Sequence, residues 1–283
     1  MRSNRRTGSC YFNYRFVQTP CMSIMMIVNN KNDRAVLMDE IRGFAILCMV
    51  IYHGVFALIM FQIIGIGHFT SFYFSDFMNV VRDVFVMVFI FVSGASSRLS
   101  RSNLKRGLIL AAISIGLTLV TYYATIFTNM NLTIWFGILH LLSVSILIFA
   151  VVKFLLDKIK PLLGIIIFTI LFLILYIAVY HMKIDIAYIF IVNYLSELFA
   201  VLFSIIFPST RLNSSDYFPI VPWIFVFITG SYFGIYIKNK KLPAFFYKTR
   251  VPFFSLIGRY TIWIYLLHQP VIFGMIYIYK MIV

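Results

Sequence analysis

Long uninterrupted apolar runs are the feature that most constrains the fold of this chain. A helix needs about 20 apolar residues to cross the hydrocarbon core of a bilayer. The chain is 62% hydrophobic and 12% charged, whereas a soluble protein is about 25% charged. We therefore expect an all-α, multi-pass protein of the cell membrane, in contact with the lipid bilayer and built from about seven transmembrane helices. The runs of spanning length lie near 41–64, 78–95, 108–127, 134–156, 162–180, 219–237 and 260–282.

A further apolar stretch, 187–207, either re-enters the membrane from the outer face or spans it as an eighth helix. Lysine and arginine decide between these alternatives, because short loops rich in them stay in the cytoplasm. With the N-terminus in the cytoplasm, seven spans keep every basic segment inside, whereas an eighth span would place 238–259 outside. We therefore favour seven spans and keep eight as the alternative. The basic residues number seven in 1–42, four in 98–106, three in 153–160 and six in 238–259.

The order of these segments predicts two regions, a basic cytoplasmic tail at 1–33 and a membrane domain at 34–283. The formal net charge is +15. In a chain this apolar, such an excess is typical of cytoplasmic loops, so we expect no nucleic-acid partner. The three cysteines (Cys10, Cys21 and Cys48) have no metal-like spacing, and we expect no metal site.

Several ionisable side chains fall inside the predicted spans, where each costs about 3 kcal/mol on insertion scales. His53 lies about 17 Å along a helix from Arg42, at 1.5 Å per residue, and is therefore near the middle of the first span. His268 lies similarly deep in the last span. His140 lies in the outer half of the fourth span, and Arg82 lies near the outer start of the second. These depths predict a polar pocket that opens outward; the alternative is separate histidines, each bonded to a neighbouring helix.

Two aspartates stand beside predicted helix ends. Asp39 precedes the first apolar run, where an N-cap or first-turn acid opposes the helix dipole. Asp216 precedes Pro219 and Pro222 at the start of the sixth span. It either caps that helix or orients a histidine or substrate by its charge, and we favour the second role.

Four blocks, in order along the chain, resemble a known enzyme family. Asp39-Glu-Ile-Arg42-Gly, followed in the same helix by His53, resembles the opening helix of the acyltransferase-3 clan of membrane enzymes. With the three later blocks, the chain is similar to the bacterial branch of the heparan-α-glucosaminide N-acetyltransferase catalytic-domain family. Those blocks are Phe136-Gly-Ile-Leu-His140-Leu-Leu-Ser143, Ser215-Asp216-Tyr-Phe-Pro219-Ile-Val-Pro222-Trp223 and Gly258-Arg259-Tyr-Thr-Ile-Trp-Ile-Tyr265-Leu-Leu-His268-Gln269-Pro270.

The resemblance implies transfer of an acetyl group from cytoplasmic acetyl-CoA to a hydroxyl or amine of an extracytoplasmic sugar or envelope glycan. His53 is then the candidate base or transient acyl acceptor. Because lysosomal members of the clan place a functional histidine in the loop after the first helix, His68 is the other candidate. The residues expected to support catalysis or bind substrate are Asp39, Arg42, Arg82, His140, Asp216, His268 and Gln269.

A transporter or exporter of an envelope precursor is the competing function. Secondary transporters often carry paired repeats with broken helices in both halves, and neither feature is visible in this sequence. Histidines at compatible depths favour the enzyme. Assembly into a homo-oligomer stays open.

Overall fold

The computed structural model describes residues 35–63, 67–128, 131–180 and 216–282. Within these ranges the structure is helical and contains no strand. The predicted tail, 1–33, and the ambiguous stretch, 187–207, lie outside the described residues.

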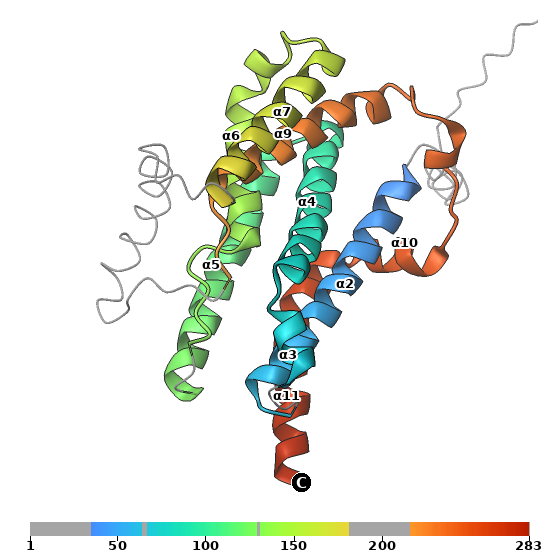
Figure 1. Cartoon of the computed structure of the whole chain (residues 1–283). Helices are drawn as coiled ribbons and strands as arrows, with labels where there is room; N and C mark the ends of the chain where they lie inside the picture. Colours follow the sequence, from blue (N-terminus) through green and yellow to red (C-terminus); the bar gives the residue numbers. More distant parts are fainter. Residues whose placement is uncertain (1–34, 64–66, 129–130, 181–215, 283) are drawn as a thin grey trace, which may run out of the picture. The chain divides into compact units, whose positions relative to one another are not determined.

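Seven helices in the described ranges are long and apolar enough to cross a membrane. They confirm the predicted all-α membrane fold and correspond to the seven predicted apolar runs (Figure 1). The choice of seven spans over eight stays a prediction, because it depends on 187–207. The side of the membrane that the N-terminus occupies stays a prediction. The seven are α2 (Val36–Met60), α4 (Asp76–Leu99), α5 (Asn103–Thr128), α6 (Ile138–Leu156), α7 (Pro161–Tyr180), α9 (Ile220–Lys238) and α11 (Thr261–Ile282).

In the part of the chain that the structure describes, three short helices join the spans: α3 (His68–Tyr73), η1 (Ala244–Phe246) and α10 (Pro252–Arg259). A search for 20-residue apolar runs cannot find elements of this size. Helix α10 begins with Pro252, whose missing N–H costs nothing in the first turn. Just before it, the backbone N–H groups of Arg250 and Val251 donate to Oε1 of Glu40, at 2.7 and 3.0 Å. The carboxylate of α2 therefore fixes the start of α10.

Glycines bring two helix pairs into backbone contact. A Cβ added at Gly94 of α4 would overlap the carbonyl oxygen of Phe227, and one at Gly230 of α9 would overlap that of Phe91. In the same way, Gly43 of α2 lies against the backbone of Phe254 in α10. Small residues at a helix interface allow this close approach in membranes. The glycine of the Asp-x-x-Arg-Gly block therefore has a packing role.

The fourth span begins later than its apolar run predicts, at Ile138 rather than residue 134. Residues 134–137 form a buried, non-helical segment because their backbone groups bond elsewhere. The amide of Ile134 donates to Thr121 Oγ1 at 3.1 Å, and its carbonyl accepts from Thr118 Oγ1 at 2.8 Å. The carbonyl of Phe136 accepts from the amide of Phe218 at 3.3 Å. This last bond places the segment that contains Asp216 beside the start of α6.

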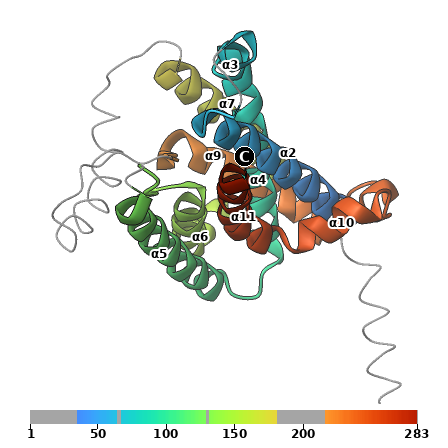
Figure 2. The same ribbon diagram turned by 90° about the horizontal axis from the view of Figure 1, so that it is seen from below.

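Side-chain contacts gather the predicted basic segments at one end of the helices, which we call the basic end. Arg42 donates to Ser96 there at 2.7 Å. Arg98 forms an ion pair with Asp157 and stacks over the ring of Phe149, 5.0 Å from its centroid. Seen from below, α11 lies between the α5–α6 pair and the α2–α10 pair (Figure 2). Among the described residues, Arg42 and the basic segments 98–106, 153–160 and 238–259 therefore share one end, as the charge counts predict.

Candidate functional site

A small cavity among the helices is lined by three of the predicted site residues. His53 comes from α2, Arg82 from α4, and Asp216 from the segment before α9. The cavity has a volume of about 30 Å³, which is room for about two water molecules. We call it the histidine cavity. Its remaining lining is Ala45, Met49, Tyr52, Phe85, Val86, Phe89, Ile138 and Phe218.

The first and last spans bring two histidines together at this cavity. The rings of His53 and His268 lie with their centroids 5.2 Å apart. Gln269, the next residue of α11, places its side-chain Nε2 3.4 Å from Nδ1 of His53. An amide group offers both a donor and an acceptor, so Gln269 is suited to holding the His53 ring in either neutral tautomer.

His268 is held in a defined tautomer by its own helix. Its Nδ1 lies 2.6 Å from the carbonyl oxygen of Tyr265, which can only accept, so Nδ1 carries the proton. In the neutral ring, Nε2 then carries a lone pair. This Nε2 is buried and has no hydrogen-bond partner among the described residues. An unsatisfied buried acceptor costs about 1–3 kcal/mol. This cost favours a chemical role for the lone pair of His268 Nε2.

Asp216 faces the histidine cavity and does not cap α9. The N-cap of α9 is Pro219, with no side-chain cap, so the capping alternative is wrong. The Tyr265 hydroxyl donates to Oδ2 of Asp216 at 3.4 Å. Burial raises the pKa of the Asp216 carboxyl to about 6, although the positive charge of Arg82 and the Tyr265 hydrogen bond act in the opposite direction. Its carboxyl can therefore change charge near neutral pH.

Arg82 is held in place by its neighbour on α4. Its Nε and Nη2 donate to Oδ1 of Asp83 at 3.0 and 2.9 Å. The other carboxylate oxygen of Asp83 accepts from the Tyr176 hydroxyl of α7 at 2.6 Å. The guanidinium thus stays cationic beside the cavity, with its orientation fixed by two helices.

Tyrosine hydroxyls are the site contacts that sequence reasoning missed. Tyr176 bonds Asp83, and Tyr265 bonds Asp216. The Tyr73 hydroxyl of α3 donates to the backbone carbonyl of Tyr52 at 3.0 Å, and burial raises its pKa above the usual range. The chain contains 18 tyrosines, so residue type alone could not single these out.

His140 lies apart from this cluster. Its Nδ1 accepts from the amide of Gly137 at 3.3 Å, so Nε2 carries the proton and donates to Thr118 Oγ1, 3.1 Å away. Both ring nitrogens therefore hold the non-helical segment before α6 against α5. This matches the alternative of a histidine bonded to a neighbouring helix.

His68 also lies apart from the histidine cavity. It is the first residue of α3 and is exposed. Among the described residues, it makes no hydrogen bond or ring contact with the cavity lining. The structure thus brings His53, Arg82, Asp216, His268 and Gln269 together and leaves out His68 and His140.

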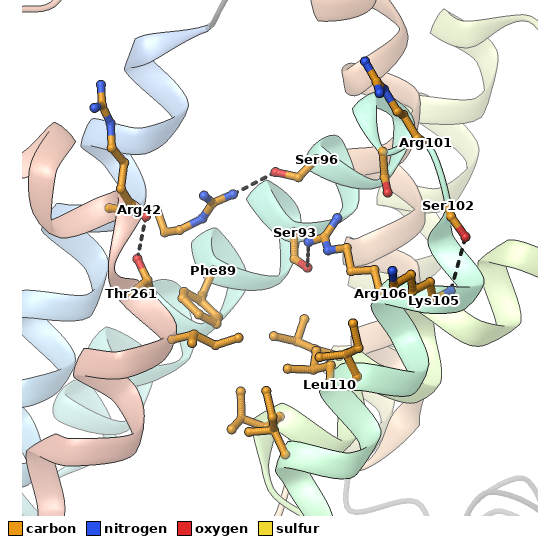
Figure 3. A pocket seen from close by; sticks show the side chains of 18 residues that line it. Arg42, Phe89, Ser93, Ser96, Arg101, Ser102, Lys105, Arg106, Leu110 and Thr261 are labelled. Atoms are coloured by element: carbon orange, nitrogen blue, oxygen red, sulfur yellow. Dashed lines mark hydrogen bonds between the residues drawn. The ribbon is translucent and has the colours of Figure 1, made fainter.

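A second, larger cavity opens at the basic end (Figure 3). Its volume is about 670 Å³, and we call it the basic cavity. No carboxylate belongs to its lining within the described part of the chain. Five cationic side chains line it: Arg42, Arg101, Lys105, Arg106 and Arg259.

Serines hold two of these cations in place. Arg42 bonds Ser96 and also lies 3.4 Å from Asp39. Asp39 is therefore a first-turn acid of α2 that orients Arg42. Arg106 donates to Ser93 at 3.4 Å (Figure 3). Arg101, Lys105 and Arg259 are exposed, so their charges are available to an anionic ligand.

Phe89 of α4 lines both cavities. In Figure 3 its ring lies below Arg42, on the opposite side of the basic cavity from Arg101 and Lys105. The inner part of the basic cavity is apolar and includes Leu110 and Ile113. The two cavities are therefore adjacent at Phe89, the residue that their linings share.

No group of three or more histidine, cysteine, aspartate or glutamate side chains in the described ranges is arranged to hold a metal ion. No curated protein and no solved structure is similar enough to the chain to match it.

One protein family matches the chain over residues 34–270. This range includes all four sequence blocks and every residue that lines the two cavities. The family's description is "Heparan-alpha-glucosaminide N-acetyltransferase, catalytic". Since the match covers most of the 283 residues, the chain belongs to this family of membrane acetyltransferases.

Proposed function

We propose that the protein transfers an acetyl group from acetyl-CoA to a hydroxyl or amine of a sugar or envelope glycan on the opposite side of the membrane. The observation that carries this proposal is the adjacency of the two cavities at Phe89. One cavity suits a polyanionic donor and the other holds a histidine pair. A donor in the first could present its reactive end to the second.

The basic cavity provides the chemistry that a CoA donor needs. Members of the family use acetyl-CoA, whose phosphates are bound most strongly by charge-assisted hydrogen bonds from arginine and lysine. Arg101, Lys105 and Arg259 are the exposed cations at its mouth. The apolar inner lining suits the uncharged pantetheine arm, which carries the thioester. On the predicted topology, this cavity opens to the cytoplasm.

Transfer requires a base for the acceptor and a donor for the developing oxyanion. The acceptor oxygen or nitrogen attacks the thioester carbonyl carbon, a new bond to that carbon forms, and the carbon–sulfur bond breaks. The His53–His268 pair takes the acceptor's proton, which then neutralises the departing CoA thiolate. Arg82 lines the same cavity and is suited to stabilising the oxyanion.

His53 is the member of the pair that lines the cavity, so we assign it to the contact with the acceptor. The lone pair of His268 Nε2 lies beside it and offers a second position for the proton. Asp216, when ionised, favours the charged form of the pair through its negative charge. The alternative in which His53 transiently accepts the acetyl group uses the same residues.

Radiolabelled acetyl-CoA supplied to membranes that contain the protein tests this proposal, with D-glucosamine as the soluble probe acceptor and the envelope fractions as the natural ones. We expect label in an acceptor, and about 10²-fold less or lower still in the same membranes with His53→Ala. Absence of transfer to D-glucosamine and to every envelope fraction would refute the proposal.

The donor site has its own test. Arg101→Glu and Lys105→Glu should each raise the KM for acetyl-CoA, because they place a negative charge where phosphates bind. Lys160→Glu is the matched control, since Lys160 is an exposed cation of the same end outside the basic cavity. An equal rise in KM for the control would assign the effect to the general field of the basic end.

A further inference from the structure

We propose that Phe89 sets the length of the acyl group, so that the enzyme selects two-carbon donors over longer ones. This inference rests on the proposed acetyl transfer and adds the residue that determines donor specificity.

The size of the histidine cavity motivates the proposal. Its volume of about 30 Å³ holds about two water molecules. That space is comparable with the acetyl group of the thioester. Its other walls include the bulky side chains of Met49, Phe85 and Phe218. A propionyl or butyryl group would therefore need space that these walls do not offer.

The position of Phe89 distinguishes it from the other walls. Phe89 is 8% exposed and packs in the main apolar core. Its neighbours on α6 each line a single cavity, Ile138 the histidine cavity and Leu139 the basic cavity. Phe89 lines both. Shortening this side chain would join the histidine cavity to the apolar inner part of the basic cavity.

A merged cavity gives the end of a longer acyl chain a place to lie. The walls beyond Phe89 are Leu110, Ile113 and Leu142 of the basic cavity. These side chains are apolar, so additional methylenes would be removed from water there. A site that now excludes a methylene would then accept it.

Purified protein in nanodiscs tests the proposal by kcat/KM for acetyl-, propionyl- and butyryl-CoA with D-glucosamine as acceptor. For each added methylene we expect the unmodified protein to lose about 10- to 200-fold. Phe89→Ala should reduce that discrimination by about tenfold or more, and Phe89→Leu should give an intermediate ratio. A ratio measured on one preparation does not depend on how much of the protein is folded.

Phe91→Ala is the matched control on the same helix. Its ring packs against Phe233 at a centroid distance of 5.4 Å and lines neither cavity, so the donor ratio should stay unchanged. Equal ratios in Phe89→Ala and the unmodified protein would overturn the inference while leaving acetyl transfer intact. If Phe89→Ala is inactive with all donors, an unchanged ratio in Phe89→Leu overturns it. No transfer by the unmodified protein would overturn both proposals.

Discussion

The imidazole rings of His53 and His268 lie 5.2 Å apart, although they come from the first and last membrane-spanning helices. Gln269 adds a side-chain contact to His53 from the same turn of α11. The pair thus depends on how α2 and α11 pack: Gln269 of α11 contacts His53, whereas His268 is held by the carbonyl of Tyr265 in its own helix. This relationship leads to the first prediction.

Replacing His53 with alanine should lower acetyl transfer by about 10²–10⁴-fold, the usual contribution of a general base. His53→Gln keeps a hydrogen-bonding group but cannot take up a proton, so it should be equally impaired. The measurement is the initial rate of label transfer per amount of folded protein, determined by gel filtration in detergent.

His68→Ala is the comparison for this prediction. Because His68 is exposed at the start of α3, its loss should change the rate less than twofold. An inactive His68→Ala protein beside a fully active His53→Ala protein would move the base to the α3 segment. Recovery of activity in His53→Gln would indicate a structural histidine.

The raised pKa of Asp216 leads us to expect that the free energy of unfolding depends on pH. Its folded pKa of about 6 lies above the ordinary value of 3.8 for an aspartate, so between these pH values the folded protein binds a proton that the unfolded chain has released. The contribution of Asp216 to the free energy of unfolding is therefore fully present at low pH and is lost as the pH rises through about 6. Asp216→Asn cannot ionise and should lack this loss.

Thermal unfolding in detergent at pH 4, 5, 6 and 7 measures the effect. The midpoint of the unmodified protein should fall relative to that of Asp216→Asn as the pH rises, and the difference should level off above about pH 7. Subtracting the two curves removes the contribution of the other carboxyl groups. A constant difference across the range would mean that Asp216 titrates at its ordinary pKa.

Gly230→Ala tests the close packing of α4 on α9. The added Cβ would overlap the carbonyl of Phe91, which belongs to a helix backbone and cannot rotate away. We expect a loss of about 1–3 kcal/mol in unfolding free energy, as for other overpacked interfaces. The measurement is denaturant or thermal unfolding in detergent.

Gly116→Ala provides the control for that substitution. Nothing lies within 4 Å of a Cβ at this position in the middle of α5. Alanine favours a helix over glycine by about 1 kcal/mol, so Gly116→Ala should be neutral or stabilising. Equal destabilisation by both substitutions would show that the helix contact is not the cause.

The orientation of the helices gives the last prediction. In a cysteine-free background, a cysteine introduced at Thr70 should react with an impermeant thiol reagent in intact cells. A cysteine at Asn239, at the basic end after α9, should be protected until the membrane is opened. Labelling at Asn239 in intact cells would place the basic end outside and would contradict the predicted orientation of the spans.

The sequence predicts the spans well because a membrane-crossing helix is a local property of about 20 residues. It also points to His53, Arg82 and Asp216, since ionisable groups inside spans are costly and so stand out. It does not predict α10 or the bonds of Glu40 to the amides before it, because both arise from residues some 210 positions apart. The hydrogen bonds that separate His140 from the cavity likewise depend on how α5 and α6 pack.

The basic cavity is the feature that sequence reasoning could not assemble. Apart from Arg42, its cations belong to segments that the sequence assigns only to cytoplasmic loops, and the packing of α4, α5 and the α10–α11 junction brings them around one space. Phe89 is one of 31 phenylalanines. Its place in the lining of both cavities depends on how the helices pack and cannot be read from the sequence.

The packing of α10 against α2 has a consequence for biosynthesis. Helix α2 enters the membrane early, yet Glu40, Gly43 and His53 contact residues that the ribosome adds some 200 positions later. Until that segment emerges, the basic cavity lacks Arg259 and the histidine pair lacks one ring. If the proposed function holds, nascent chains are inactive, and the packing of the last two helices completes the site.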